Sequence, residues 1–336
     1  MQQAIDKAAV LIEALPYVQR YYEKIVVVKL GGSVMDDPEA ERELLRDIVF
    51  MNYVGMRPII VHGGGKEISA AMDEAGLEPN FVQGLRYTDD RTLAIAERVL
   101  CGRINRRLVE TLESFGVQAI GLNSLTSCVL FADRLYLSGD EGRRIDIGAV
   151  GKIESVNARI LHLLCAADTI PVIAPIARDR SGGKLNCNAD TAAGEVAAAL
   201  AAEKLIMISD THGIRANPDD PDSFCPTLNR NEISDFLKKG IIGKGMIPKV
   251  EACLRALDAG TSKAHIVDGR IQHSPLLEIF TDRGIGTQIL AQSPLAEALR
   301  GTPDWENNGS KARRAGDLSL VCPADRYRCS PPVKSC

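Results

Sequence analysis

Two glycine-rich stretches are the parts of this chain best suited to chemistry. The first is an apolar run, residues 25–30, which is interrupted by Lys29 and followed at once by Gly31 and Gly32. A lysine at the end of a buried strand is costly unless a negative group lies beside it. Two glycines let the backbone turn and let a ligand come close. The stretch fits either a phosphate-binding turn or a strand end whose lysine extends into solvent.

The second stretch, His62-Gly63-Gly64-Gly65, follows the apolar run 58–61 and precedes a helix predicted from Glu67. A strand, a glycine turn and a helix in this order present backbone N–H groups and a helix N-terminus to an anion. The spacing matches neither the Walker A loop nor the dinucleotide fingerprint. We therefore favour an anion or ligand contact over a plain loop.

Further polar residues stand at the ends of predicted elements. Arg86 comes just before a long helix, predicted over 90–113 and capped by Thr88 or Asp89. The segment 186–190, Asn-Cys-Asn-Ala-Asp, opens an alanine-rich helix predicted over 191–202. A helix cap would account for one polar side chain of this segment, with Asp190 as an ordinary cap. The two asparagines would then have no explanation.

Strands alternate with helices along the chain, which predicts an α/β fold. We expect a three-layer αβα sandwich with a mostly parallel central sheet and right-handed crossovers. Ligands of such sheets bind at the carboxyl ends of the strands. Lys29, the triple glycine and the pair Ser209-Asp210 all follow predicted strands, so they should meet at one edge. This convergence favours the phosphate interpretation.

Composition restricts the class of protein. The chain has 336 residues, 45% hydrophobic and 25% charged, with a net charge of −4. These values are typical of a soluble protein and give no electrostatic case for nucleic acid or a membrane as a partner. The N-terminus lacks a signal-peptide pattern, and the nine cysteines include no Cys-x-x-Cys pair. We expect a cytoplasmic protein with reduced cysteines and no zinc site.

The two ends of the chain carry their own expectations. A helix is predicted over 4–22, with a stripe of Leu11, Leu15, Val18 and Tyr22 and a kink or break near Leu15 caused by Pro16. That helix could pack on its own subunit or join subunits. Residues 127–153 are predicted to form hairpins or a flap. Residues 296–336 lose apolar periodicity, so we expect a mostly disordered tail; a metal site at its three cysteines is improbable.

The motifs resemble those of the acetylglutamate kinase family, a member of the amino acid kinase superfamily. They run in order over residues 1–290 and are Lys29-Leu30-Gly31-Gly32, His62-Gly63-Gly64-Gly65, Gly84-Leu85-Arg86 with Thr88-Asp89, Asn186-Cys187-Asn188-Ala189-Asp190, Ser209-Asp210 with Gly213-Ile214, Gly245-Met246 with Lys249, and Leu277-Glu278-Ile279-Phe280-Thr281-Asp282 through Gly286-Thr287. The Gly-Leu-Arg and Asn-x-Asn-Ala-Asp pieces are the most specific. The chain departs from the usual pattern at Lys66, where proline is frequent, and at Tyr87.

The resemblance implies a two-lobed enzyme. Residues 23–180 would bind N-acetyl-L-glutamate, and residues 181–295 would bind ATP. The reaction would transfer the γ-phosphoryl group to the side-chain carboxylate, which is the second step of arginine biosynthesis. Mg²⁺ would be held mainly by phosphates and water, without a metal site made of protein side chains.

The resemblance also implies the role of each matching residue. Lys29 and Lys249 would flank the moving phosphoryl group, with Asp190 holding both. The substrate would contact Gly64, Gly65, Arg86 and Asn186. The ATP site would include Gly31, Gly32, Ser209, Asp210, Gly213, Gly245 and Met246.

Arginine inhibition is implied by two features beyond the catalytic part. In the arginine-inhibited branch of the family, N-terminal helices join dimers into a hexamer, a trimer of dimers. L-Arginine binds there between this helix and a late glycine turn. Residues 1–22 would be that helix, and Glu278, Gly284 and Gly286 would form the effector site.

Two other interpretations stay open at this point. One is a different kinase of the superfamily, acting on another small substrate. The other is a non-catalytic, arginine-binding kinase-like module, as in N-acetylglutamate synthases. Those proteins carry an acetyltransferase domain after the kinase-like part, and the 46 residues after Leu290 are too few for one.

Overall fold

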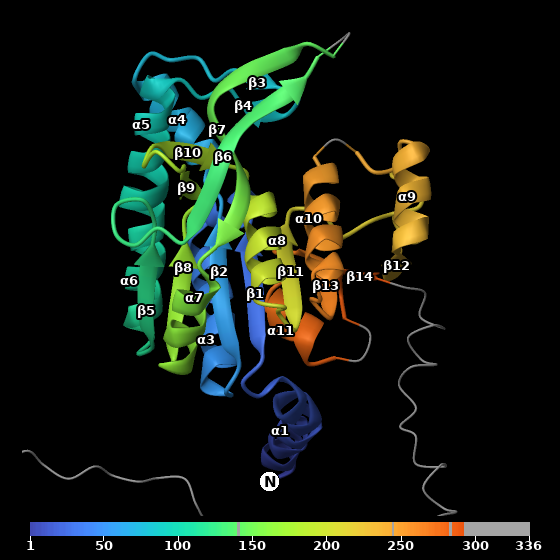
Figure 1. Ribbon diagram of the computed structural model, residues 1–336. Coiled ribbons are helices and arrows are strands. Elements are labelled where there is room, and N and C mark those ends of the chain that lie inside the picture. Colours follow the sequence, from blue (N-terminus) through green and yellow to red (C-terminus); the bar gives the residue numbers. More distant parts are fainter. Residues whose placement is uncertain (140–141, 244, 282–283, 292–336) are drawn as a thin grey trace, which may run out of the picture. The chain divides into compact units, whose positions relative to one another are not determined.

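The fold is built on an eight-stranded sheet, and β1 (Ile25–Leu30) lies near the middle of that sheet (Figure 1). The computed structural model describes residues 1–139, 142–243, 245–281 and 284–291. The strand order is β12-β14-β13-β11-β1-β2-β8-β5, and every neighbouring pair is parallel except β13 and β14. The other strands are β2 (Arg57–His62), β5 (Gln118–Leu122), β8 (Thr169–Ile173), β11 (Lys204–Ser209), β12 (Thr227–Asn229), β13 (Lys263–Asp268) and β14 (Thr287–Leu290). The predicted mostly parallel sheet is confirmed.

Helices cover both faces of this sheet, which confirms the predicted three layers. One core lies under α2 (Gly32–Met35), α3 (Pro38–Tyr53), α4 (Gly65–Glu74), α5 (Asp90–Glu97), α6 (Arg106–Ser114) and α11 (Ser274–Ile279). The other lies under α7 (Ala158–Ala166), α8 (Ala189–Ala199), α9 (Arg230–Lys238) and α10 (Ile247–Asp258). Residues 1–294 form one compact unit.

The alternation of β1 decides where its lysine points. Val26 and Val28 belong to the core under α3, whereas Val27 belongs to the core under α8. Successive side chains of a strand point to opposite faces. Lys29 therefore shares the face of Val27 and is directed at α8.

The predicted helix over 90–113 is present but is not regular. It runs as α5, a π-helical stretch η1 (Arg98–Asn105) and α6. Leu100, Ile104 and Leu108 are all buried. The π turn follows from tertiary packing around Leu100 and Ile104 and has no signature in local sequence.

A second, smaller sheet was only partly predicted. The expected short hairpins are one long hairpin of β6 (Leu130–Ser138) and β7 (Arg144–Val156), which extends past the carboxyl edge of the main sheet (Figure 1). It closes into a four-stranded barrel with β9 (Ile176–Arg178) and β10 (Lys184–Cys187). The pair β3 (Phe81–Val82) and β4 (Leu85–Arg86) was also not predicted. Strands this short are determined by their pairing partners more than by their own residues.

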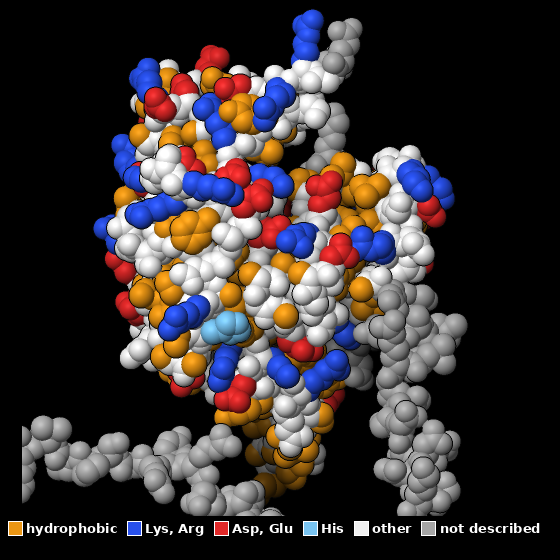
Figure 2. Space-filling model, in the orientation of Figure 1, with side chains coloured by type: hydrophobic (Ala, Val, Ile, Leu, Met, Phe, Trp, Pro, Cys, Tyr) orange, Lys and Arg blue, Asp and Glu red, His pale blue; other side chains and the backbone are white. Residues whose placement is uncertain are grey.

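The first helix, α1 (Gln2–Tyr21), runs through Pro16 without the expected break. The predicted stripe does not pack on the rest of this chain along its whole length, because Leu11 and Leu15 are 70% and 44% exposed. Tyr21 is buried instead, and the ring of Tyr17 packs edge-on against that of Phe280 with centroids 6.2 Å apart. Hydrophobic side chains consequently lie uncovered over α1 (Figure 2).

Three remaining expectations concern the tail, the membrane and the cysteines. The tail over 296–336 lies outside the described residues. Within the part that the structure describes, no helix is both long and apolar enough to cross a membrane. Six described cysteines are free, and burial raises the pKa of Cys165 to about 11 and that of Cys187 to about 12.

Candidate active site

One carboxylate shared by two lysines stands at the carboxyl edge of the main sheet. Asp190 Oδ1 lies 2.7 Å from Lys29 Nζ, and its Oδ2 lies 3.3 Å from Lys249 Nζ. The three residues come from β1, α8 and α10. Lys29 and Asp190 are buried, and Lys249 also donates to the carbonyl of Gly245 at 3.3 Å. The site therefore holds two ammonium groups against one acid, which leaves net positive charge for an anionic ligand.

The cap of α8 explains why Asp190 is available. Asn188 is the N-cap, and its Oδ1 accepts the N–H of Thr191 at 3.0 Å. The expectation that Asp190 caps this helix is therefore wrong. Burial alone would raise the pKa of Asp190, but the ammonium groups of Lys29 and Lys249 outweigh it and hold that pKa below its usual range. Asp190 is ionised at neutral pH.

A cavity of about 240 Å³ opens beside this cluster and collects the residues expected to bind substrate. Its walls include Lys29, Gly64, Gly65, Arg86, Asn186 and Asp190. A side chain on Gly64 would place its Cβ 2.5 Å from Ile104 Cδ1 and 2.7 Å from Leu100 Cδ2. Only glycine fits between this turn and η1, so the turn comes close to η1 while its other side lines the cavity.

Arg86 is a buried cation whose described hydrogen-bond partners are all neutral. Its Nη2 donates to the Gly65 carbonyl and to Ser69 Oγ, both at 2.8 Å, and its Nη1 lies 3.2 Å from Met72 Sδ. The guanidinium lies 4.8 Å from the centroid of the Phe81 ring. Burial lowers the pKa of Arg86. A buried guanidinium whose described hydrogen bonds go only to neutral groups, with the charge of Asp73 nearby, is well placed to receive a carboxylate from a ligand.

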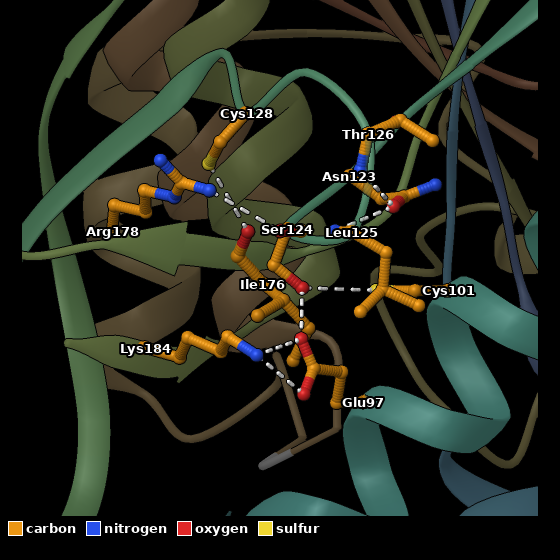
Figure 3. Close-up of polar contacts among 10 residues, drawn as sticks. All are labelled: Glu97, Cys101, Asn123, Ser124, Leu125, Thr126, Cys128, Ile176, Arg178 and Lys184. Atoms are coloured by element: carbon orange, nitrogen blue, oxygen red, sulfur yellow. Dashed lines mark hydrogen bonds and ion pairs between the residues drawn. The ribbon is translucent and has the colours of Figure 1, made fainter. Parts of the chain in front are cut away.

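The strand β10, which carries Asn186, is fastened by the polar cluster in Figure 3. Lys184 Nζ pairs with Glu97 Oε1 of α5 at 2.7 Å. Ser124 Oγ donates to the same oxygen at 2.5 Å and lies 3.5 Å from Cys101 Sγ. Two residues along β10 from Lys184, Asn186 Nδ2 donates to Thr88 Oγ1 at 3.3 Å. The cluster thus holds β10 against the helix that follows Arg86.

Two further cavities continue along the same sheet edge. One, of about 610 Å³, is lined by Lys29, Gly31, Gly32, Lys66, Ser209, Asp210 and Lys249, among others. The next, of about 320 Å³, is lined by residues that include Asp210, Gly213, Gly243, Met246 and Arg270. The residues expected at an ATP site therefore adjoin the two-lysine cluster, and Gly245 joins them through its contact with Lys249.

The described residues include no group of three or more His, Cys, Asp or Glu side chains suited to a metal ion. Asp210 is exposed at the end of β11, beside Ser209. A carboxylate in that position could reach a cation held by phosphate oxygens and water.

Glu278 lies in a separate buried cluster toward the amino ends of the strands. Its carboxylate pairs with His265 Nδ1 and accepts the N–H groups of Ile285 and Gly286 at 2.8 and 2.9 Å. Lys204, the first residue of β11, donates to the Glu278 carbonyl at 3.3 Å. The Lys204 ammonium lies 5.0 Å from the centroid of the Tyr21 ring. The carboxylate expected to meet an effector is therefore already bonded inside the protein.

This cluster contains charged groups that motif reasoning missed. Burial lowers the pKa of Lys204 to about 8 and also lowers the pKa of His265. His265 Nε2 is buried without a hydrogen-bond partner among the described residues. Gly284 has φ +61°, and a Cβ there would lie 2.5 Å from Glu278 Oε1. The only sequence signal for this cluster was that Lys204 and His265 stand within apolar strands.

A buried network behind the triple glycine was also missed. His62 Nδ1 donates to the Gly63 carbonyl at 2.8 Å, and its Nε2 accepts from Asn105 Nδ2 at 3.2 Å. Asn105 also donates to the Val172 carbonyl at 2.9 Å and accepts from Asn123 at 2.8 Å. Burial lowers the pKa of His62 to about 4. A neutral imidazole therefore fixes the orientation of the Gly63 peptide.

Comparisons of sequence identify relatives of the chain. The model of the amino acid kinase family matches residues 24–268. An acetylglutamate kinase of Symbiobacterium thermophilum is 46% identical over 290 residues, which covers 86% of this chain and 99% of the relative. One of Methanothrix thermoacetophila is 47% identical over 285 residues, covering 85% and 99%.

Comparisons of structure give the same fold. An N-acetylglutamate synthase from Neisseria gonorrhoeae, solved with coenzyme A and N-acetyl-glutamate, superposes with a TM-score of 0.75 at 24% identity. The match covers 85% of this chain and 64% of the synthase chain. A carbamate kinase from Giardia lamblia superposes with a TM-score of 0.59 at 16% identity, covering 80% and 99%. At these identities the likeness is one of fold alone.

The His62 network predicts how stability depends on pH. Because the pKa of folded His62 lies below its unfolded value, its contribution is complete above about pH 6.5 and is lost as pH falls toward 4. The loss reaches about 3 kcal/mol of unfolding free energy. Urea unfolding between pH 7 and 4 should show a shallower decline in His62→Gln or His62→Asn than in the wild type. His162→Gln, at an exposed histidine of α7, is the control, and equal slopes in all proteins would contradict this role.

Proposed function

This chain belongs to the acetylglutamate kinases of the amino acid kinase family, and we propose from that premise how its residues carry out the reaction. The enzyme uses ATP to phosphorylate the side-chain carboxylate of N-acetyl-L-glutamate, giving N-acetyl-L-glutamyl 5-phosphate. The observation that carries the residue assignments is the Lys29–Asp190–Lys249 cluster, which adjoins both the cavity of about 240 Å³ and the cavity of about 610 Å³. We place N-acetylglutamate in the cavity of about 240 Å³, which is lined mainly by the lobe over 23–180. We place ATP in the cavities of about 610 and 320 Å³, which the lobe over 181–295 lines together with the glycine turns of the first lobe.

The chemistry needs positioning and positive charge more than it needs a base. A carboxylate is already ionised at pH 7, so its oxygen attacks the γ-phosphorus directly, the bond to the ADP oxygen breaks, and the electron pair leaves with ADP. Two anions must be held together during this step. The Lys29 and Lys249 ammonium groups neutralise the charge of the transferring group, and Asp190 keeps both in place. Arginine biosynthesis supplies this substrate and uses the product.

The substrate is held by groups that lie around the smaller cavity. Arg86 receives the α-carboxylate in place of its neutral partners, since a guanidinium offers a planar fork to two oxygens. Asn186 and the backbone of Gly64 and Gly65 hydrogen-bond the remaining polar groups. These contacts bring the side-chain carboxylate toward Lys29.

ATP is placed along the two cavities on the other side of the lysines. The Gly31 and Gly32 N–H groups face its terminal phosphates, and Ser209, Asp210, Gly213 and Met246 line the rest, with Gly245 adjoining them through its carbonyl contact with Lys249. A Cβ on Gly31 would lie 2.6 Å from the Ile208 carbonyl, so the turn requires glycine. Mg²⁺, when bound, supplies charge neutralisation on the phosphates, and Asp210 would hold it through water.

The two competing interpretations are less well supported. The synthases resemble this chain in fold at 22–24% identity, whereas acetylglutamate kinases match it at 46–47% over nearly their whole length. The buried guanidinium of Arg86 beside the glycine turn suits a substrate that carries a second carboxylate. A substrate panel with hydroxylamine trapping of the acyl phosphate tests the assignment directly. Activity with another carboxylate or carbamate but none with N-acetylglutamate would overturn it.

The lysine cluster yields the first test of mechanism. Lys29→Met and Lys249→Met should each lower kcat about a hundredfold or more, because each removes charge that matters most in the transition state. The KM values should change less. Steady-state kinetics with the coupled assay measures both, and circular dichroism confirms folding. A near-normal kcat for Lys29→Met would leave that lysine only as a partner of Asp190.

The carboxylate clamp is tested through the KM values of the two substrates. Arg86→Met should raise the KM for N-acetylglutamate about tenfold or more and change the KM for ATP little. Arg86→Lys should restore only part of the loss, since the fork is missing. Equal increases in both KM values would show that Arg86 instead supports the glycine turn through Gly65 and Ser69.

We place a regulatory L-arginine site at the buried Glu278 cluster, beneath the end of α1. Tyr21 closes that cluster from α1, and the Gly284 and Gly286 turn closes it from the other side. His265 Nε2 has no partner among the described residues, and once Nδ1 is released by Glu278 the imidazole can carry its proton on Nε2 and donate it to the effector's carboxylate. Glu278 would exchange its bond to His265 for the effector's guanidinium. A small movement at Tyr21 would then displace α1.

We place a second copy of the chain over the exposed face of α1. Ile5, Leu11, Ile12 and Leu15 are 44–70% exposed on this one helix, although isolated apolar residues are normal on a surface. Helices with such a face generally cover it. Pairing of α1 between subunits joins dimers into a hexamer, a trimer of dimers. Arginine binding under α1 would then favour the less active arrangement of subunits.

Deletion of residues 1–20 tests assembly and regulation together. The truncated enzyme should be an active dimer without inhibition by L-arginine, whereas the full chain should be a hexamer with sigmoidal inhibition. Leu11→Glu should resemble the deletion, and Leu163→Glu, at a 61% exposed leucine of α7, is the matched control. Light scattering and activity with and without arginine give the readouts. A full chain that is only a dimer, or a truncation with unchanged inhibition, would contradict this scheme.

A further inference from the structure

Lys66 is a charged residue of the nucleotide cavity that none of the roles above uses. It is the second residue of α4, directly after the triple glycine, and it lines the cavity of about 610 Å³ together with Lys29, Lys249 and Ser209. Its side chain is 68% exposed. Its only described ion pair is with Asp36, the residue that ends α2.

The Lys66–Asp36 ion pair joins the two segments that follow the glycine turns. Asp36 follows the turn at Gly31 and Gly32, and Lys66 follows the turn at Gly63 to Gly65. Gly65 lines both the nucleotide cavity and the smaller substrate cavity. The stem of Lys66 therefore starts where the two cavities meet, and its flexible four-carbon chain lets the ammonium move between partners.

We propose that Lys66 is a third cation for the terminal phosphoryl group of ATP, and that Asp36 is its partner only while the nucleotide is absent. The inference deepens, and rests on, the nucleotide site proposed above. An exposed ion pair such as Lys66–Asp36 contributes about 0–1 kcal/mol, so leaving it costs little. A hydrogen bond from ammonium to a phosphate oxygen, beside other cations in a partly enclosed cavity, is stronger. Binding of ATP therefore draws Lys66 away from Asp36.

The alternative is that the ion pair acts as a clasp between the two glycine turns. The two ideas predict opposite signs for a change at Asp36. If Asp36 competes with phosphate for Lys66, then Asp36→Asn frees the lysine and strengthens ATP binding. If the pair is a clasp, Asp36→Asn loosens both turns and weakens ATP binding, as a change at Lys66 would.

Calorimetric binding of an ATP analogue with a β,γ-imido bridge, and of ADP, provides the test. Lys66→Met should weaken binding of the analogue about tenfold, in line with a charge-assisted bond, and weaken ADP binding less than threefold. Lys66→Arg should keep most of the affinity. Asp36→Asn should strengthen analogue binding by about twofold to threefold. The double variant should bind as Lys66→Met does.

The control is Lys152→Met. Lys152 is 67% exposed and pairs with Glu154 at 3.1 Å on β7, so it matches Lys66 in exposure and pairing but does not line the nucleotide cavity. Analogue binding by this control should equal that of the wild type. Unchanged binding in Lys66→Met, equal losses for ADP and the analogue, or weaker binding in Asp36→Asn would each overturn the inference. A wild-type enzyme that bound no ATP would instead overturn the proposed nucleotide site.

Discussion

The site depends on one buried carboxylate that balances two ammonium groups. Removing an ion from water is expensive, so Lys29, Asp190 and Lys249 are tolerable in the interior only together. Each comes from a different element, and the sheet brings β1 beside α8 and α10. Because the cluster keeps one positive charge in excess, the same balance that permits burial also attracts an anionic substrate. The burial of the cluster and its attraction for an anion therefore depend on the same balance of two positive charges and one negative charge.

Around that cluster the protein separates rigid parts from adaptable ones. The glycine turns sit on central strands and are fixed by close packing, as at Gly64, and by the buried imidazole of His62. Arg86 and Asn186, by contrast, belong to short strands outside the main sheet. Their hydrogen bonds go largely to neutral groups such as Ser69 and Thr88, which a ligand can replace. Phosphoryl transfer needs rigid charge at the reacting atoms, whereas recognition benefits from groups that can change partners.

Most strands of the main sheet could be predicted from the sequence, because strongly apolar strands and glycine turns are local signals. The sequence also placed Lys29, Arg86, Asn186 and Asp190 around one site, partly through family motifs. What it missed depends on distant contacts. The barrel strands β9 and β10 pair with each other and depend on β6 and β7 to complete the barrel, and the π turn in η1 depends on packing. The apolar stripe of α1 fits a buried face and an exposed face equally well, because the sequence of a helix does not show which neighbour covers the stripe.

The same strands that end in the site begin in the Glu278 cluster, which gives the proposed regulation a physical route. β11 runs from Lys204 in that cluster to Ser209 in the nucleotide cavity, a distance of about 17 Å at the rise of a strand. β13 runs beside it in register and contributes His265 to the cluster. A ligand that exchanges partners with Glu278 acts at one end of two strands that pair with each other along their whole length. Coupling between the two ends then requires that β11 and β13 move as a unit relative to β1, which carries Lys29. Because Asp190 binds both Lys29 and Lys249, the site is sensitive to such a movement.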